Sequence, residues 1–253
     1  MRIMKAIRDM EICSARAYLL ALSTVLVLNT GEANAARGNE PQPKCDYVEY
    51  QRLPLTKQHG IDGALVVMRD RSMITAEEYS VDDHETSCNA LLYLEGNNNK
   101  RIETHELERP IARINTVNLI GGRPKSFSLT VDYSAGFGSY AGPGTKFFDV
   151  AAGKIKWVQA KDEKTNKVEK IHVAQTLKTV WKLFPHGKNQ DILEILCRPA
   201  FKSKSDDTFE VTYKRYRYNG HDWIHYSRSE DGFWENEGDF PKESLFPPLR
   251  QKN

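Results

Sequence analysis

The sequence has almost no net charge. Its 253 residues include 36 Lys and Arg against 34 Asp and Glu, which leaves a formal charge of +2. A balance this even excludes strong steering toward nucleic acid or a charged membrane surface by net charge. Apolar residues make up 40% of the chain and charged residues 28%, close to the average of folded globular proteins. The composition therefore indicates an ordinary folded chain and selects no partner by sign.

Sequence signatures of catalysis are also missing. Neither the G-x-S-x-G motif of many hydrolases nor the H-E-x-x-H motif of zinc proteases occurs. The loop 136–144 contains a G-x-G-x-x-A spacing, but a strand follows where a dinucleotide site needs a helix. His221 and His225 fall on an expected strand, about 13 Å apart, which is too far to share one metal ion. Residues 82–85, Asp-Asp-His-Glu, lack the spacing of a calcium loop, so we expect neither a cofactor nor a metal.

No apolar run is long enough to cross a membrane as a helix. The run over residues 17–28 has about twelve residues, whereas a spanning helix needs roughly twenty. Four basic residues precede this run and Ala33-Asn34-Ala35 follows it, which are the three parts of a secretory signal peptide. We therefore expect a signal peptide over 1–35, a flexible lead-in over 36–44, and a periplasmic or secreted mature protein without a transmembrane segment.

Cysteine is scarce. Of the four cysteines, Cys13 lies in the expected signal peptide, which leaves Cys45, Cys88 and Cys197. In an oxidising compartment one disulfide and one free thiol is the simplest outcome, and the sequence permits three pairings. We favour Cys45 with Cys88, because both lie in polar, turn-rich stretches. Cys197 ends an apolar run, so we expect it to behave as a small buried hydrophobe.

Segments of strand length separated by turn residues make up most of the mature chain, a spacing that is typical of an all-β protein. They cover residues 63–69, 90–95, 114–120, 127–133, 146–150, 154–158 and 191–197. One helix is predicted over 173–183, where apolar residues recur at helical intervals, and Thr75 to Glu78 has the spacing of a capped helical turn. We expect a single mainly β domain over 45–253, an antiparallel sandwich or curled sheet with one or two helices, with a small β-propeller as the alternative.

The clearest hairpin pairs residues 209–218 with 221–228 around Asn219-Gly220, a dipeptide that suits a two-residue turn. Tyr213 lies on one face of the first strand and Tyr216 on the other, which requires either a bulge or aromatic side chains on both faces. The aromatic density from Tyr213 to Trp234 indicates core packing first, with Trp223 as the anchor, and a surface that grips a partner second.

A resemblance is carried by short motifs in the second half of the chain. These are the segments 132–140, 181–183, 191–193 and 232–235, together with the Phe240-Pro241 and Phe246-Pro247 pairs. Over roughly the last 120 residues the chain resembles uncharacterised exported proteins of Gram-negative bacteria. The resemblance implies an exported, β-rich protein, and it implies no activity and no site residue.

We interpret the chain as an exported periplasmic binding protein with another protein as its partner, such as an inhibitor or an immunity protein. A fold of this kind serves many functions, so two alternatives stay open: a hydrolase with dispersed catalytic residues, and an envelope glycan-binding or structural module. Nucleic acid is not an expected partner, no catalytic residue is nominated, and the oligomeric state stays open. The residues expected to contact the partner are Phe137, Tyr140, Tyr216, Arg217, Tyr218 and Trp234.

Overall fold

The computed structural model describes residues 44–76, 87–133, 138–200, 209–236 and 238–247. These residues form β-strands and short 3₁₀ helices, and no helix among them is long and apolar enough to cross a membrane. The 3₁₀ helices are η1 (Lys57–His59), η2 (Arg71–Met73), η4 (Asn97–Asn99) and η5 (Glu243–Leu245). The expected signal peptide, the lead-in up to residue 43, the second half of the Thr75 to Glu78 turn, the acidic cluster 82–85 and Phe137 lie outside the described residues.

The first sheet is formed by four consecutive strands, each antiparallel to the next. They are β1 (Tyr47–Pro54), β2 (Ala64–Asp70), β3 (Leu91–Glu95) and β4 (Arg101–Glu106). Strands β2 and β3 are nearly continuous apolar runs, and their buried side chains include Leu65, Val67, Leu92 and Leu94. The predicted strands at 63–69 and 90–95 are therefore confirmed.

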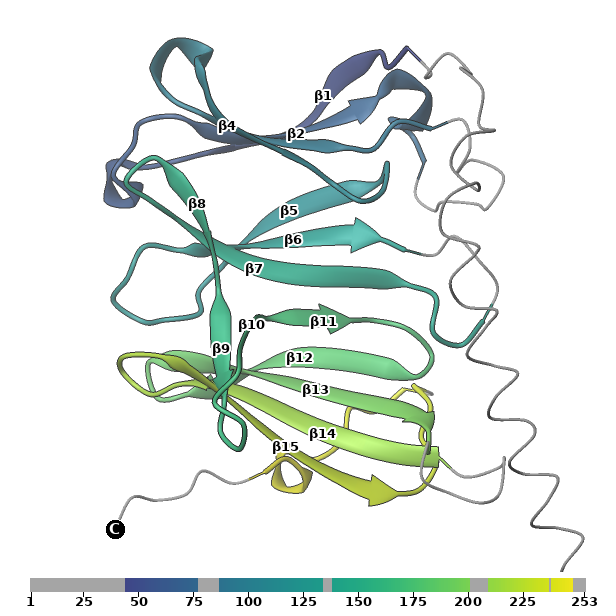
Figure 1. Ribbon diagram of the computed structural model, residues 1–253. Coiled ribbons are helices and arrows are strands. Elements are labelled where there is room, and N and C mark those ends of the chain that lie inside the picture. The colour runs from purple at the N-terminus through teal and green to yellow at the C-terminus, as the bar shows by residue number, and fades with distance from the viewer. Residues whose placement is uncertain (1–43, 77–86, 134–137, 201–208, 237, 248–253) are drawn as a thin grey trace, which may run out of the picture. The chain divides into compact units, whose positions relative to one another are not determined.

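The second sheet has the order β11-β7-β6-β5, and β8 pairs with the far end of β7 (Figure 1). Its strands are β5 (Ala112–Val117), β6 (Ser126–Asp132), β7 (Pro143–Ala151), β8 (Lys154–Trp157) and β11 (His172–Ala174). The turn from β7 to β8 places Ala152 and Gly153 at positive φ, the backbone that a tight hairpin turn requires. The predicted strands at 127–133, 146–150 and 154–158 match β6, β7 and β8.

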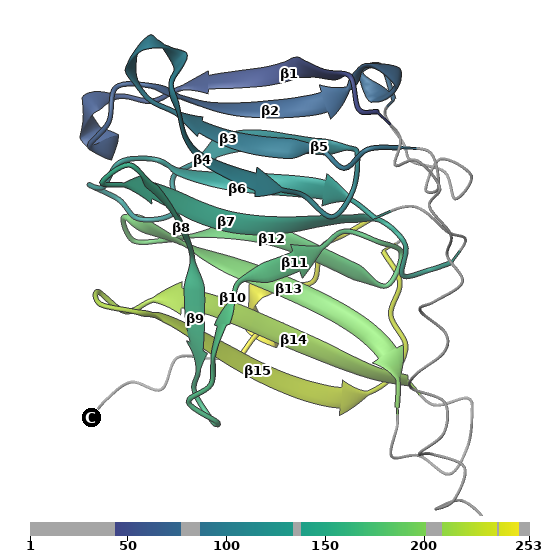
Figure 2. The ribbon, with the colours of Figure 1, turned by 45° about the horizontal axis from the view of Figure 1, so that its top comes forward.

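The third sheet has the order β10-β9-β15-β14-β13-β12. Its strands are β9 (Gln159–Asp162), β10 (Val168–Lys170), β12 (Thr179–His186), β13 (Asn189–Pro199), β14 (Phe209–Tyr218) and β15 (Trp223–Asp231). The chain passes from the second sheet into β9, returns through β10 to β11, and comes back as β12 (Figure 2). Because β9 lies parallel to β15, residues far apart in the sequence meet at this edge.

The three largest apolar clusters of the described residues, called here the first, second and third cores, lie on the faces of these sheets. The first core joins the first and second sheets and includes Leu65, Leu129 and Phe148. The second core joins the second and third sheets and includes Phe147 and Ile192. Because Phe147 and Phe148 are consecutive strand residues, their side chains point to opposite faces of β7, and both are fully buried. The second sheet is therefore apolar on both faces.

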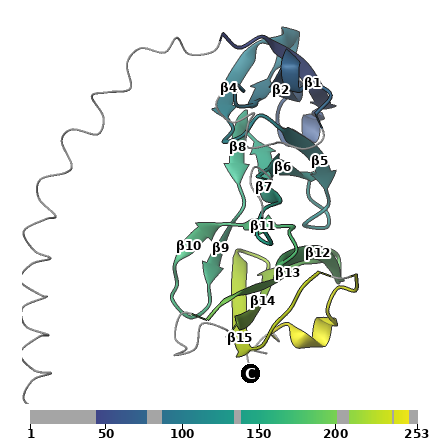
Figure 3. The same ribbon diagram turned by 90° about the vertical axis from the view of Figure 1, so that its right-hand side faces the viewer.

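The third core covers the other face of the third sheet. Ile195 and Tyr213 belong to it, and Phe246 of the C-terminal segment seals it. The C-terminal segment is held by polar contacts as well: Arg215 Nη2 lies 3.2 Å from Glu243 Oε1, and Arg228 Nε donates to the Leu245 carbonyl at 2.6 Å. Figure 3 shows this segment, which includes η5, on one side of strands β13 and β14 and the β9–β10 hairpin on the other. The second and third cores therefore cover the two faces of the third sheet.

Two side chains link the first sheet to backbone groups of the second. The Gln51 amide donates to the Ile114 carbonyl at 2.6 Å and accepts from the Ile114 amide at 2.9 Å. The Glu103 carboxylate accepts from the amide of Ile155 at 2.8 Å. Unpaired backbone groups at sheet edges favour association with other chains, so these side chains satisfy groups that would otherwise be exposed to a foreign strand.

The helix predicted over 173–183 is wrong. Val173 lies in β11, and residues 179–186 form β12, which pairs along its length with β13. Val180 and Phe184 face the third core, while Trp181 and Leu183 face the second. A strand that is apolar on both faces produces the same close spacing of apolar residues as an amphipathic helix, so spacing alone could not separate the two.

The predicted hairpin is confirmed as β14 and β15, but its loop is longer than predicted. Tyr218 pairs with Trp223, so four residues form the loop in place of two. The Asn219 carboxamide accepts from the amides of His221 and Asp222, both at 2.9 Å, which closes the loop through its side chain. The register moves by two residues, which leaves every side chain on its expected face. No bulge interrupts β14, so aromatic side chains occupy both of its faces.

Both cysteine predictions are confirmed. Cys45 and Cys88 form a disulfide with a Cα–Cα distance of 5.8 Å, and Cys197 is a buried free thiol. The bridge joins the start of the described chain to the residues just before β3. In the chain-entropy account, a disulfide that closes a loop of this length stabilises the folded protein by about 4 kcal/mol.

The core position of Trp223 gives the first test. Trp223 is 6% exposed and packs in the second core, with its ring centroid 5.9 Å from that of Tyr218. We expect Trp223→Ala to lower the free energy of unfolding by about 3–5 kcal/mol, because it leaves a cavity. Phe233→Ala is the control, since Phe233 is 60% exposed. Equal melting curves for Trp223→Ala and the unmodified protein would refute the core assignment.

Candidate functional site

Three of the residues predicted to contact a partner are buried in β14. Tyr216, Arg217 and Tyr218 are 7%, 7% and 8% exposed. The Tyr216 ring stacks on the His225 ring at 4.8 Å, and the Tyr218 hydroxyl accepts from Arg123 at 2.6 Å. Arg217 Nε donates to both carboxylate oxygens of Asp191 at 2.8 Å. A partner would meet only the small exposed parts of these three side chains, whose principal contacts are internal.

Tyr140 and Trp234 lie elsewhere, near Lys178. The amide of Lys178 donates to the Ser139 carbonyl at 3.1 Å, next to Tyr140. Its ammonium lies 2.6 Å from Glu235 and 3.4 Å from the centroid of the Phe233 ring. Trp234 is partly buried against the third core. Trp234 therefore packs against a different core from Tyr216 and Tyr218.

Three exposed apolar side chains lie on the loops that meet at Lys178. Tyr140, Leu177 and Phe233 are 49%, 57% and 60% exposed, and we call these three residues the apolar end. They come from three loops: the one before β7, the one between β11 and β12, and the segment after β15. The Asn236 amide donates to the Leu177 carbonyl at 2.8 Å, which ties the last two together.

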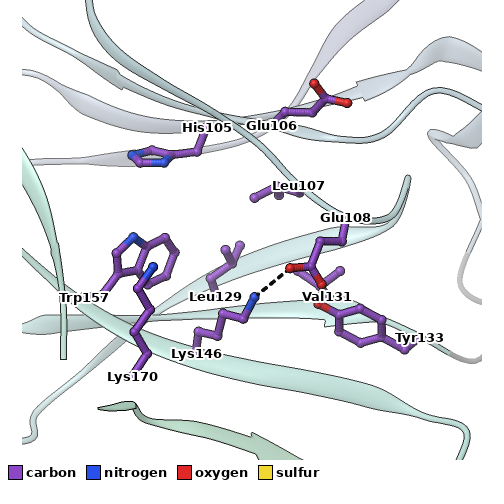
Figure 4. Close-up of a pocket in the computed structure, with 10 residues that line it drawn as sticks. All are labelled: His105, Glu106, Leu107, Glu108, Leu129, Val131, Tyr133, Lys146, Trp157 and Lys170. Atoms are coloured by element: carbon purple, nitrogen blue, oxygen red, sulfur yellow. Dashed lines mark hydrogen bonds and ion pairs between the residues drawn. The ribbon is translucent and has the colours of Figure 1, made fainter. Parts of the chain in front are cut away.

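A pocket of about 180 Å³ opens between the first and second sheets (Figure 4). We call it the lysine pocket, because two lysines reach it from different strands. Its lining comes from all three sheets: His105, Glu106, Leu107, Glu108, Leu129, Val131, Tyr133, Lys146, Trp157 and Lys170. Leu107, Leu129 and Val131 form an apolar floor, with Trp157 on one side and Tyr133 on the other.

Close packing at β7 shapes the Tyr133 side of the lysine pocket. A Cβ atom added to Gly144 would lie 2.5 Å from His172 Nε2 and 2.9 Å from the Tyr133 ring. Only glycine therefore lets both rings lie against the backbone of β7 at this point. Lys146, two residues later, points to the same face and pairs across the ladder with His172.

Glu108 is the polar centre of the lysine pocket. The Tyr133 hydroxyl donates to Glu108 Oε2 at 2.6 Å, and Lys146 Nζ lies 3.2 Å from Oε1. The hydrogen bond from Tyr133 and the charge of Lys146 lower the pKa of Glu108. Burial and the carboxylate of Glu108 raise the pKa of Tyr133 far above its usual value of 10. Burial and Lys146 lower the pKa of His172.

The other side of the lysine pocket is built around Trp157. Its ring meets the Phe148 ring at a centroid distance of 5.4 Å and the edge of the His105 ring at 5.9 Å. His105 Nε2 is fixed by Glu103 Oε1 at 2.7 Å. Lys170 Nζ lies 5.4 Å from the Trp157 ring centroid, within reach of a cation–π interaction. Trp157 is therefore held in place by its neighbours, while the exposed Lys170 covers it from the solvent side.

These ionisation states suit hydrogen bonding better than proton transfer. A general acid or base works best with a pKa near the working pH. The pKa of Glu108 is shifted down and that of Tyr133 is shifted up, so both move away from neutrality. At pH 7 the lysine pocket offers an ionised carboxylate, a protonated phenol and an ammonium group. It is a fixed set of hydrogen-bond donors and acceptors over an apolar floor.

No metal centre is found among the described residues. Their one group of closely spaced ligand-type side chains is Cys45, Asp70 and Cys88. The disulfide removes both thiolates, so this group offers a metal only one carboxylate.

No local sequence pattern indicates the lysine pocket. Its residues lie between 105 and 170 on five separate segments, and each is unremarkable in its local context. The alternation of β8, Lys154-Ile155-Lys156-Trp157, predicts a half-buried strand and does not reveal that Trp157 borders a cavity. No protein-family model, curated protein or solved structure matches the chain.

The lowered pKa of Glu108 predicts a dependence of stability on pH. A carboxyl group with a lowered folded-state pKa stabilises the fold above its usual pKa of 4.5 and loses this effect as the pH falls through the folded value. We expect the unmodified protein to be more stable than Glu108→Gln at pH 7, and the gap to narrow below pH 4.5. Urea unfolding of both proteins from pH 7 to pH 3 measures this difference in the free energy of unfolding.

Tyr133→Phe serves as the companion variant, because it removes the hydrogen bond that contributes most to the shift. The difference in the free energy of unfolding between Tyr133→Phe and the unmodified protein should also narrow over this pH range. A gap that stays constant from pH 7 to pH 3 in both variants would contradict the assigned role of Glu108.

Proposed function

We propose that the protein is an exported binding protein that holds a protein partner through the apolar end. The observation that carries the proposal is the exposure of Tyr140, Leu177 and Phe233 on neighbouring loops. Exposed apolar groups that gather at one place on a folded surface are typical of interaction sites. Loops at the ends of rigid strands are where binding residues concentrate.

The apolar end is organised in advance of binding. Lys178 is 4% exposed although it carries a charge, because Glu235 and the Phe233 ring receive its ammonium group. Lys178 thus joins all three loops, because its side chain contacts Glu235 and Phe233 and its backbone amide donates to the Ser139 carbonyl. A surface that is already ordered loses less conformational entropy when a partner docks, which favours tight binding. Aromatic residues are also the usual anchors of protein interfaces.

Export is supported by two features of the sequence and structure. Residues 1–35 have the basic, apolar and Ala-x-Ala parts of a signal peptide, so we propose that the mature chain begins at Ala36 in the periplasm. The Cys45–Cys88 disulfide is compatible with an oxidising compartment. An inhibitor or an immunity protein against an envelope-attacking toxin is the specific form of this proposal.

Binding is favoured over hydrolysis by the chemistry of the described residues. In the lysine pocket, the pKa of Glu108 is lowered and the pKa of Tyr133 is raised, so both move away from the range that proton transfer requires. Cys197 is buried, so its thiol is inaccessible to a substrate.

Site-specific photocrosslinking tests the proposal. A photoreactive amino acid at Leu177 should give a discrete crosslinked species in the periplasm, whereas the same group at Val168 or Ile102 should not. These control positions are 56% and 48% exposed and lie on β10 and β4, so they match the exposure of the apolar end. With the captured protein purified, we expect Phe233→Ser to weaken binding by about 2 kcal/mol or more, roughly thirtyfold. Val168→Ser should leave the affinity unchanged.

Two results would contradict the proposal. Equal crosslinking from Leu177, Val168 and Ile102 would show that the apolar end has no special role. A protein that stays in the cytoplasm with Met1 retained would contradict export.

A further inference from the structure

We propose that the lysine pocket binds one neutral sugar ring of a glycan. This site is separate from the apolar end, so the inference goes beyond protein binding. It rests on the size of the pocket, the balance of its charges and the placement of its aromatic side chains.

The size of the pocket limits the ligand. Pockets for whole drug-sized molecules usually measure about 300–1,000 Å³. The lysine pocket has a volume of about 180 Å³ and is open on one side. It therefore has room for a single ring whose remaining units extend into solvent, as a residue of an oligosaccharide would.

The charges of the pocket favour a neutral ligand. The charges beside the floor are paired, because Lys146 Nζ lies 3.2 Å from Glu108 Oε1. The Glu106 carboxylate points away from the floor and accepts from the Asn89 amide (Figure 4). A neutral ligand leaves the Lys146–Glu108 pair intact, and sugar hydroxyls can both donate to Glu108 and accept from the ammonium groups of Lys146 and Lys170.

The apolar parts of the pocket suit the C–H faces of a sugar ring. A pyranose ring carries C–H groups on its faces, and aromatic rings and aliphatic side chains are the surfaces on which these faces rest. Trp157 stands at one side of the floor formed by Leu107, Leu129 and Val131, and Tyr133 at the other (Figure 4). Phe148 and His105 fix the Trp157 ring, so the platform exists before the ligand arrives.

Lys170 is the adjustable element of the site. Its ammonium covers the Trp157 ring at 5.4 Å, and no carboxylate of the described residues lies within salt-bridge distance of it. Its side chain is exposed. Lys170 can therefore leave the ring as a sugar stacks there, and then donate hydrogen bonds to hydroxyl groups.

Tryptophan fluorescence and calorimetry with neutral oligosaccharides test the inference. The probes are β-1,4-linked tetramers of glucose and of N-acetylglucosamine, with glucuronate and inorganic phosphate as anionic probes. We expect saturable binding of at least one tetramer and no binding of the anions. Trp157→Phe, which keeps an aromatic ring against Phe148, should weaken the sugar affinity at least tenfold. The exposed substitution Lys170→Ala should weaken it severalfold without affecting folding.

Trp234→Phe is the matched control, because Trp234 packs against the third core away from the pocket. It should leave the sugar affinity unchanged, as should Phe233→Ser, which separates this test from that of the apolar end. The inference is overturned if neither tetramer binds at concentrations up to about 10 mM, if an anion binds more tightly than both sugars, or if Trp157→Phe binds as well as the unmodified protein.

Discussion

The burial of both faces of β7 is the constraint on which the rest of the structure depends. Phe147 and Phe148 are consecutive residues, and both side chains are fully buried. Phe147 belongs to the core shared with the third sheet, and Phe148 to the core shared with the first. A strand with no solvent-exposed face requires an apolar layer on each side of it, and at β7 both layers are sheets. Neither neighbouring sheet can then be removed without exposing a phenylalanine, and the same strand positions Gly144 and Lys146 for the lysine pocket.

Alternation and turn chemistry predicted most of the strands, and they failed at β12. β6, β7, β13 and the β14–β15 hairpin follow from short apolar runs bounded by turn residues. The run from Val173 to Phe184 was mistaken for a helix because β12 is apolar on both faces. The two-residue turn predicted at Asn219-Gly220 is a four-residue loop in the structure, because the Asn219 side chain accepts hydrogen bonds that close the longer loop. The disulfide was predictable from its polar flanks, whereas the lysine pocket depends on contacts between sheets that no local pattern encodes.

The aromatic residues serve two purposes that the sequence could not separate. Tyr216, Tyr218 and Trp223 fill the second core, and Tyr213 packs edge-on against Phe246 of the C-terminal segment. These residues use their ring area for stability. Tyr140 and Phe233 are exposed beside Lys178, and Trp157 borders a pocket, so their rings are available to other molecules. Strand parity settles which face a residue takes, but whether that face is covered depends on the neighbouring sheet.

Native-state hydrogen exchange in Phe147→Ala tests the dependence on β7 most directly. Phe147 packs on the side of the third sheet, so it contributes to a core that excludes β2 and β3. Phe147→Ala should lower the free energy of unfolding by about 3–5 kcal/mol. If burial of both faces of β7 couples the sheets, the most protected amides of β2 and β3 should exchange faster by the same factor as those of β13, on the order of a hundredfold or more. Unchanged exchange in β2 and β3 alongside faster exchange in β13 would contradict this account.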